Sequence, residues 1–228
     1  MPIDPNPPDR WQKWFEDIWA YREETLYRQW FGDIGSQIYT LTPDLFKHLG
    51  VKDPDSRWLH HGIFACPPDG SRTHWAYITS GLSNPWGQDP DSTNPKEFSG
   101  LGMELVLLTP RELPAGVGAL SWLSAVILLV AAGRIRGDLP EKGDRVPLGT
   151  SLDAASDSPL RHLILSDPPA PLPAQFELAS GVVDLVLCTG ITDAERDFAR
   201  AHDSAALLEK LQQAGASPLT DTARHSVI

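Results

Sequence analysis

Two stretches of sequence decide the fold: His-Trp-Ala-Tyr-Ile-Thr-Ser-Gly-Leu-Ser at residues 74–83, and Ser-Gly-Leu-Gly-Met-Glu-Leu-Val-Leu-Leu at residues 99–108. In the first, aromatic and β-branched side chains alternate with others, as in a β-strand. The second runs apolar after Glu104, which indicates a central strand covered on both faces. We therefore expect two strands joined by a polar loop, with Glu104 as the one charge of the second strand.

Apolar periodicity and turn residues predict the remaining elements. Asp9 can cap a helix that begins near Arg10, and Gln12 stands at the third position of a capping box. Ser204 can cap a helix over residues 204–214, and a Pro-Pro-Asp-Gly turn at residues 67–70 predicts a hairpin. The other expected elements are strands over residues 59–66, 160–165 and 182–187, helices over 42–49, 120–132 and 193–202, and an irregular loop over 137–157.

Together these elements predict an α+β fold, a mixed and mainly antiparallel β-sheet flanked by helices. The 228 residues can bury one sizeable core, and no low-complexity linker divides them. Residues 2–8 are rich in proline. We therefore expect residues 1–9 to form a flexible N-terminal arm and residues 10–228 to form a single domain.

Charge and cysteine content narrow the class of partner and the compartment. The formal net charge of −11 argues against binding nucleic acid, which needs clustered Lys and Arg, and favours a basic protein partner. Cys66 and Cys188 lack the spacing of a metal or redox motif, so we expect a reducing, cytoplasmic location. The start of the chain has no secretory signal pattern, and residues 120–132 are too short an apolar run to cross a membrane.

Residues capable of catalysis are present, but their spacing does not match a known site. His60, His61 and His74 could in principle hold a metal, yet no carboxylate stands at a typical ligand spacing. Ser80 lacks the first glycine of a nucleophile elbow, and the acidic residues of the 137–157 loop lack calcium-loop spacing. We predict no catalytic residue, no metal and no cofactor.

The loop between the two opening strands holds the candidate binding residues. Trp86 lies in the loop sequence Asn-Pro-Trp-Gly-Gln-Asp-Pro at residues 84–90, and exposed aromatic residues are common interface anchors. We predict that Trp86, Asp89 and Glu97 contact a protein partner. The alternative for Trp86 is that its ring folds back to cover the edge of the sheet.

The two strand sequences resemble motifs of the suppressor of fused family, H-W-x-Y-x-x-x-G-L-S and G-x-G-x-E-L. Three later segments match in the same order. They are Gly-Asp-Arg-Val at residues 143–146 with Ser-Leu-Asp at 151–153, the strand at 160–168, and the Gly181 to Thr192 strand followed by Glu195, with Leu-Thr-Asp at 219–221 and Arg224 near the end. The resemblance covers roughly residues 60–226.

This resemblance implies a function in protein binding. Animal suppressor of fused proteins have two domains and are non-enzymatic regulators that hold Gli-type transcription factors in the cytoplasm, partly by strand addition. This chain is similar to the amino-terminal domain only. Single-domain bacterial relatives resemble immunity proteins that block polymorphic toxins. We therefore expect an immunity protein for a basic toxin; the alternatives are an enzyme of unrecognised type and a scaffold that sequesters a cytoplasmic protein.

Overall fold

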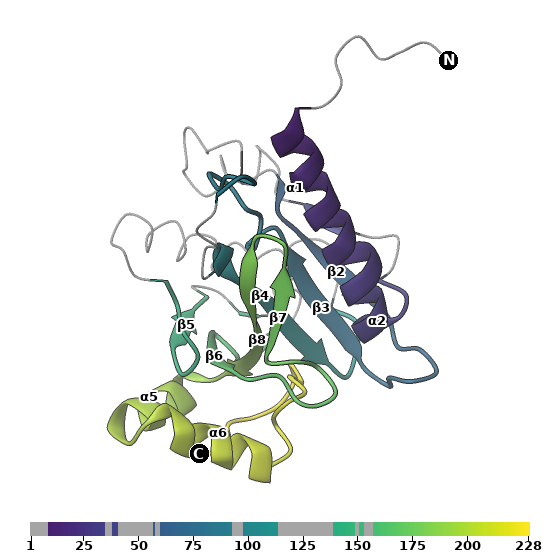
Figure 1. Cartoon of the computed structure of the whole chain (residues 1–228). Helices are drawn as coiled ribbons and strands as arrows, with labels where there is room; N and C mark the ends of the chain where they lie inside the picture. The colour runs from purple at the N-terminus through teal and green to yellow at the C-terminus, as the bar shows by residue number, and fades with distance from the viewer. Residues whose placement is uncertain are drawn as a thin grey trace.

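The computed structural model describes residues 9–34, 38–40, 57, 60–92, 98–113, 139–148, 151–152 and 157–228. Within these residues, one mixed sheet and two groups of helices form the molecule (Figure 1), which confirms the predicted α+β class. No helix in this part of the chain is long and apolar enough to span a membrane. The helices are α1 (Arg10–Ala20), the π-helix η1 (Tyr21–Tyr27), α2 (Arg28–Phe31), α5 (Asp193–Ala201) and α6 (Ser204–Gln213); the strands are β1 (Ile38–Thr40), β2 (Gly62–Cys66), β3 (Trp75–Ser80), β4 (Phe98–Thr109), β5 (Arg145–Pro147), β6 (His162–Ser166), β7 (Gln175–Leu178) and β8 (Gly181–Ile191).

The strands are ordered β1-β2-β3-β4-β8-β6-β5, and β7 forms a hairpin with β8. Every pairing is antiparallel except β4 with β8, where Leu105 lies opposite Val186. The predicted β2–β3 hairpin is confirmed, with Phe64 opposite Ile78. Residues 102–109 of β4 are all buried, as expected for a central strand covered on both faces.

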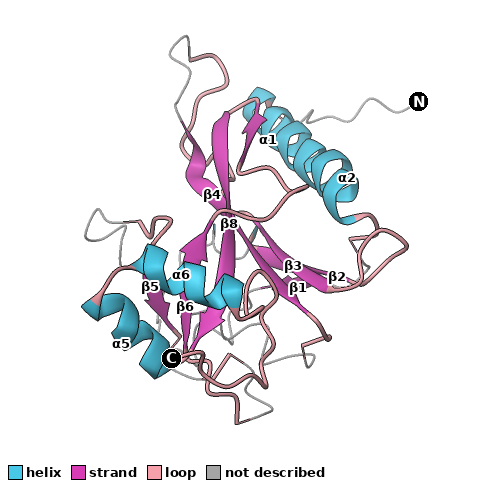
Figure 2. Ribbon diagram, turned by 90° about the horizontal axis from the view of Figure 1, so that it is seen from below, coloured by secondary structure: helices cyan, strands magenta, loops and turns pink. Residues whose placement is uncertain are grey.

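Side chains that alternate along the strands form separate clusters on the two faces of the sheet. On one face, Ile18, Tyr27 and Phe31 of the N-terminal helices pack against Val106 and Leu108 of β4. Helices α5 and α6 cover Ile164 of β6 and Ile191 of β8. These two side chains lie on the same face of the sheet as the N-terminal helices. Figure 2 shows the two helical groups at opposite ends of the sheet.

Several predicted boundaries were wrong for reasons visible in the structure. Strand β2 begins at Gly62, so His60 and His61 precede the strand instead of alternating across it. Asp203 caps α6 by accepting a hydrogen bond from the Ala206 amide, and the Ser204 hydroxyl donates to the Gly143 carbonyl.

At the first helix, Asp9 is the cap, as predicted, and accepts from the Gln12 amide. The Gln12 side chain donates to Glu16 instead of completing a capping box. The region expected to be an irregular loop, residues 137–157, contains strand β5, and strand β7 was not predicted. The predicted helices over residues 42–49 and 120–132 lie outside the described residues.

Candidate functional site

The buried carboxylate of Glu104 fixes the start of the loop that carries the predicted binding residues. Oε1 accepts hydrogen bonds from the amides of Gly81 (3.0 Å) and Ser83 (2.9 Å) and from the Ser83 hydroxyl (2.6 Å). Oε2 accepts from the Thr79 hydroxyl at 2.5 Å. Because Glu104 is on β4 and its partners are at the end of β3, this one side chain ties the loop to the centre of the sheet.

Arg22 of the π-helix is the cation beside Glu104. Its side chain is fully buried, with Nη1 at 3.7 Å from the Glu104 carboxylate. The guanidinium donates to the hydroxyls of Ser83 and Ser80 and to the side-chain oxygen of Asn84, at 2.7–2.9 Å. Arg22 thus joins the N-terminal helix to the same turn. In the sequence, Arg22 stands between Ile18 and Leu26 at four-residue steps, which puts it among apolar residues on one helix face. This spacing does not predict that the arginine meets Glu104.

A neighbouring phenol completes this buried polar cluster. The Tyr27 hydroxyl donates to the Thr79 carbonyl at 2.7 Å. Burial raises the pKa of Tyr27 well above its ordinary value, and the Glu104 carboxylate raises it further. The phenol therefore stays protonated and acts as a hydrogen-bond donor. The polar groups of this cluster hold the β3 end in place, which is a structural role.

The loop then packs tightly against the first residues of β4. Gly100 has a φ of +56°, and a Cβ at this position would lie 2.4 Å from the Asn84 carbonyl oxygen. Only glycine tolerates both the left-handed backbone and this close approach. The Leu101 amide donates to the Leu82 carbonyl at 2.8 Å. The glycine of the opening motif thus lets the loop lie directly on β4.

Gln88 fixes the middle of the loop through both ends of its amide. Its Nε2 donates to the carbonyls of Ser180 (3.0 Å) and Phe98 (3.2 Å), and its Oε1 accepts from the Gly100 amide (3.0 Å). The Trp11 indole of α1 donates to the Gln88 carbonyl at 3.0 Å. The loop is therefore held by α1, β4 and the β7–β8 turn together.

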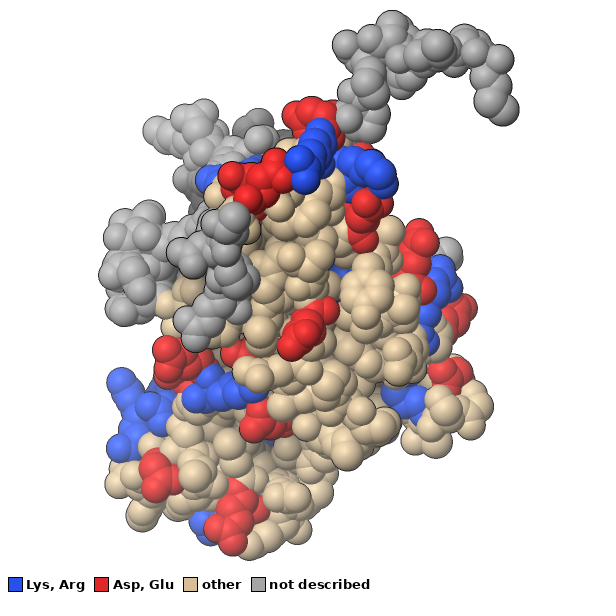
Figure 3. All heavy atoms as spheres, in the orientation of Figure 1, with Lys and Arg blue, Asp and Glu red and all other residues tan. Residues whose placement is uncertain are grey.

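Helix α1, the loop and the β7–β8 hairpin enclose a hollow of about 320 Å³, which we call the Asp89 groove. Asp89 is exposed and Gln88 is buried at its side. Asp89 and Glu177 are its charged lining residues, and none of the described cations lines it. On the same side of the molecule, Figure 3 shows charged side chains gathered where α1 begins, above a largely uncharged region. The groove is lined by Trp14, Gln88, Asp89, Pro90, Ser92, Glu177, Leu178, Ala179, Ser180, Gly181 and Val182.

The three predicted contact residues lie in different surroundings. Asp89 lines the groove, whereas Glu97 lies outside the described residues. Trp86 is half-buried, and its ring centroid lies 4.7 Å from Phe15, 5.8 Å from Trp11 and 5.4 Å from His60. The alternative from the sequence was that the ring covers the edge of the sheet; in the structure it packs mainly on Trp11 and Phe15 of α1. The contact with a partner stays a prediction. Trp14 and Glu177 were not predicted, because only the tertiary fold brings α1 and β7 to this loop.

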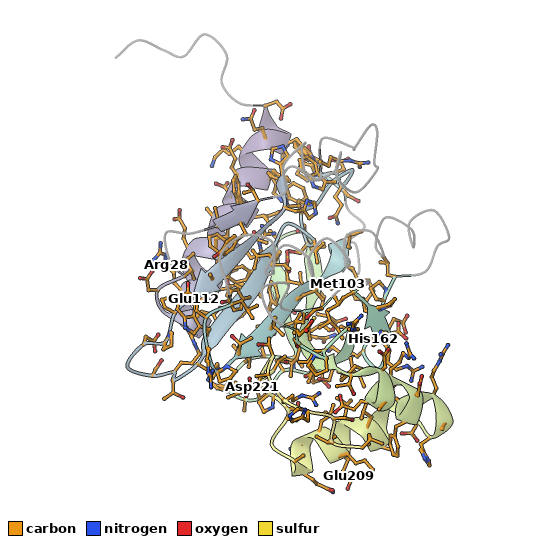
Figure 4. All side chains as sticks on the ribbon, turned by 180° about the vertical axis from the view of Figure 1, so that it is seen from behind. Arg28, Met103, Glu112, His162, Glu209 and Asp221 are labelled. Carbon is orange, nitrogen blue, oxygen red and sulfur yellow. The ribbon has the colours of Figure 1, made fainter. Side chains whose placement is uncertain are left out.

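The histidines considered for chemistry do not converge. His60 and His61 lie at the start of β2, while His74 precedes β3 at the other end of the hairpin. Across the described ranges, no three metal-ligating side chains come together. His162, labelled in Figure 4, is a separate case: its Nε2 lies 2.9 Å from Asp193, and this contact lowers the pKa of Asp193.

Near the C-terminus, a second buried ion pair links helix α5 to the last residues. Glu195 accepts from both terminal nitrogens of Arg224, at 2.6 and 2.8 Å, and from the amide of Thr192. Burial would raise the pKa of Glu195, but these hydrogen bonds outweigh it and hold that pKa below its ordinary value. This pair contains two of the residues that carry the family resemblance, and its role in the fold is structural.

The fold and the site define a class of protein: an α+β domain with a preorganised acidic groove and no assembled catalytic cluster among its described residues. The family model described as "Suppressor of fused protein (SUFU)" matches residues 57–225. The chain belongs to the suppressor of fused family, whose members are protein-binding regulators.

Solved structures agree on the fold. A suppressor of fused homologue from Neisseria gonorrhoeae FA 1090 superposes with a TM-score of 0.63 at 21% identity, covering 93% of this chain and 98% of that one. The Sufu–Fu complex gives 0.66 at 21% identity, covering 92% and 91%. Drosophila Suppressor of Fused gives 0.55 at 22% identity, covering 73% of this chain and 42% of its own. No curated protein matches this chain.

Proposed function

We propose that this protein is a non-catalytic inhibitor that binds a basic protein partner at the Asp89 groove, and that the partner is a toxin to which it gives immunity. The observation that carries the proposal is the groove itself, which is rigidly supported and lined by two carboxylates with no cation among its described residues. The net charge of −11 favours the same kind of partner. A relative of the same fold, Sufu, was solved in complex with another protein, Fu.

The support beneath the groove favours binding over catalysis. Buried Gln88 and the Glu104 cluster fix the loop before any partner arrives, so little ordering entropy is lost on association. Enzymatic function was the alternative based on His60, His61 and His74, and the length of the β2–β3 hairpin separates His74 from the other two. A scaffold that sequesters a cytoplasmic protein would use the same groove, and differs from immunity only in the identity of the partner.

The experiment compares protection and binding for matched charge variants. Toxin domains encoded beside the gene are co-expressed with the wild-type protein, with Asp89→Asn/Glu177→Gln, and with Asp157→Asn/Glu209→Gln. The control removes two carboxylates that are exposed elsewhere on the surface. We expect the groove variant to lose protection and to bind at least tenfold more weakly, while the control stays close to wild type.

Salt gives a second measurement on the same complex. Complementary charge raises the association rate, and this rate falls as ionic strength screens it. The wild-type rate should therefore fall with added salt, and the rate of the groove variant should fall less. Equal loss in the two charge variants would remove the Asp89 groove from the proposal. Absence of binding to any neighbouring toxin would remove the immunity role.

A further inference from the structure

A second hollow lies away from the Asp89 groove and shares none of its lining residues. It has a volume of about 480 Å³ and lies between the end of α2, the segment before β3, the end of β4 and the chain that joins β6 to β7. We call it the Arg72 pocket. Its walls are mostly apolar, formed by Trp30, Phe31, Leu108, Leu172 and Leu219 together with three prolines. The volume and the lining are typical of a small-molecule site.

Arg72 is the one charged residue in the described lining of this pocket. Its Nε donates to the His74 carbonyl at 2.9 Å, and Nη1 donates to the Phe31 carbonyl at 3.1 Å. Nη2 donates to the carbonyls of Pro67 (2.6 Å) and Cys66 (3.3 Å). Four neutral acceptors therefore hold the guanidinium in place, and among the five N–H groups of an arginine they leave one on Nη1.

Among the described carboxylates, the nearby Asp69 interacts with the Arg72 side chain through longer-range charge attraction. Hydrogen bonds from Ser71 lower the pKa of Asp69 most, and this attraction contributes. No described Asp or Glu forms an ion pair with Arg72, and Asp69 accepts instead from Ser71 and from the Arg72 backbone amide. His74, also in the lining, adds no charge at neutral pH, because burial and the adjacent Arg72 lower its pKa. The pocket thus presents a fixed cation at the edge of an apolar surface, in a protein of net charge −11.

We propose that the Arg72 pocket binds a small apolar monoanion, an alkyl or aryl carboxylate. The apolar body of the ligand lies against Trp30, Leu172 and Leu219, and its carboxylate accepts the remaining N–H of Arg72. A hydrogen bond between two charged groups is stronger than one between neutral groups, and a partly buried site screens it less. Charge complementarity thus selects the anion, and the apolar walls select its body. This site is independent of the proposed inhibitory function.

The test uses three probes of equal chain length: octanoate, 1-octanol and octylammonium. Binding is measured by titration calorimetry on the full chain, and the location by amide and indole NMR shifts. We expect octanoate to bind about tenfold more tightly than octanol, with octylammonium weakest, because only the carboxylate gains a charge-assisted hydrogen bond. The shifts should centre on residues 71–74 and the Trp30 indole.

A matched pair of variants isolates charge without removing Arg72, whose hydrogen bonds support the fold. Thr73 is exposed at the pocket and can be changed to Glu or to Gln, which have nearly the same size. Thr73→Glu should weaken octanoate binding about tenfold and leave octanol unchanged, whereas Thr73→Gln should affect neither. Equal binding of octanoate and octanol, equal effects of the two variants, or shifts centred elsewhere would each overturn the proposal.

Discussion

The Arg22 guanidinium lies 3.7 Å from the Glu104 carboxylate, and both side chains have no exposed surface. The pair joins the π-helix to the central strand of the sheet, and the two side chains share the Ser83 hydroxyl as a hydrogen-bond partner. Buried charges are tolerated only when they are paired and hydrogen-bonded. This pair meets both conditions through the Arg22 Nη atoms, while Nε has no hydrogen-bond partner among the described residues.

Replacing Glu104 with Gln tests this pair. The change leaves the neighbouring Glu23 carboxylate, 3.6 Å from Nη2, as the remaining described ion-pair partner of buried Arg22. Removal of one partner of a buried pair costs about 3 kcal/mol. Urea unfolding should show a fall of this size in the free energy of unfolding. Asp17→Asn, in an exposed pair with Lys13, is the control and should change it by less than about 0.5 kcal/mol. A loss for Glu104→Gln as small as that of the control would contradict a stabilising pair.

Gly100→Ala tests the close approach of the loop to β4. A new Cβ would lie 2.4 Å from the Asn84 carbonyl oxygen, in addition to the strain of a φ of +56°. Gly87, in the same loop, is a matched control, because its φ is +73° and no described atom lies within 4 Å of the added Cβ. We expect Gly87→Ala to cost about 1 kcal/mol and Gly100→Ala at least twice as much. Similar thermal stabilities of the two variants would contradict the packing argument.

Two variants of Trp86 test whether the ring stabilises the domain by packing. Its ring packs on Trp11 and Phe15, so Trp86→Ala should destabilise the domain by about 2 kcal/mol. The Trp86 Nε1 is buried without a hydrogen-bond partner among the described residues. Trp86→Phe removes this unpaired donor and keeps a smaller aromatic ring against α1, so it should cost about 1 kcal/mol, less than the alanine variant. Chemical unfolding of both variants measures the difference, and equal losses would rule out ring packing as the main role.

The Glu195–Arg224 pair predicts a pH dependence. Because the pKa of Glu195 is lower in the folded protein than its ordinary value of 4.5, the unfolded chain takes up the proton first as the pH falls. The stabilisation is full above pH 4.5 and is lost as the pH falls through the folded pKa. Glu195→Gln should therefore be less stable than wild type at neutral pH, and the gap should narrow in acid. Glu209→Gln, exposed on α6 (Figure 4), should show no such change.

The sequence predicts most of the sheet, because local pattern determines it. The unbroken apolar run of β4 and the Pro-Gly turn before β3 identify buried strands and a hairpin without tertiary information. Strand β7 has only four residues, so its own sequence pattern is too short to predict a strand. Its pairing with β8 is what establishes it. The cap predicted for α6 was wrong by one residue, because Asp203 and Ser204 are both good capping residues and Asp203 is the one that caps the helix.

The candidate site was less predictable, because it depends on long-range contacts. Asp89 could be proposed from its loop, but Glu177 and Trp14 reach the groove only through the β7–β8 hairpin and α1. Trp86 illustrates the same limit. An aromatic residue in a polar loop shows the same sequence pattern whether its ring faces a partner or packs on a helix of its own domain. The partners of Glu104 are also distant in sequence, and no spacing rule connects a helical arginine to a strand.

The parallel pairing of β4 with β8 has a consequence for synthesis of the chain. Residues 103–107 of β4 pair with residues 184–188, so the middle of the sheet forms only after β8 has left the ribosome. Until then, the apolar residues of β4 have one antiparallel neighbour, β3, and an open edge on the other side. Such long-range pairing slows folding and exposes an edge that can aggregate. Slow translation between β4 and β8 should therefore increase the need for a chaperone during folding.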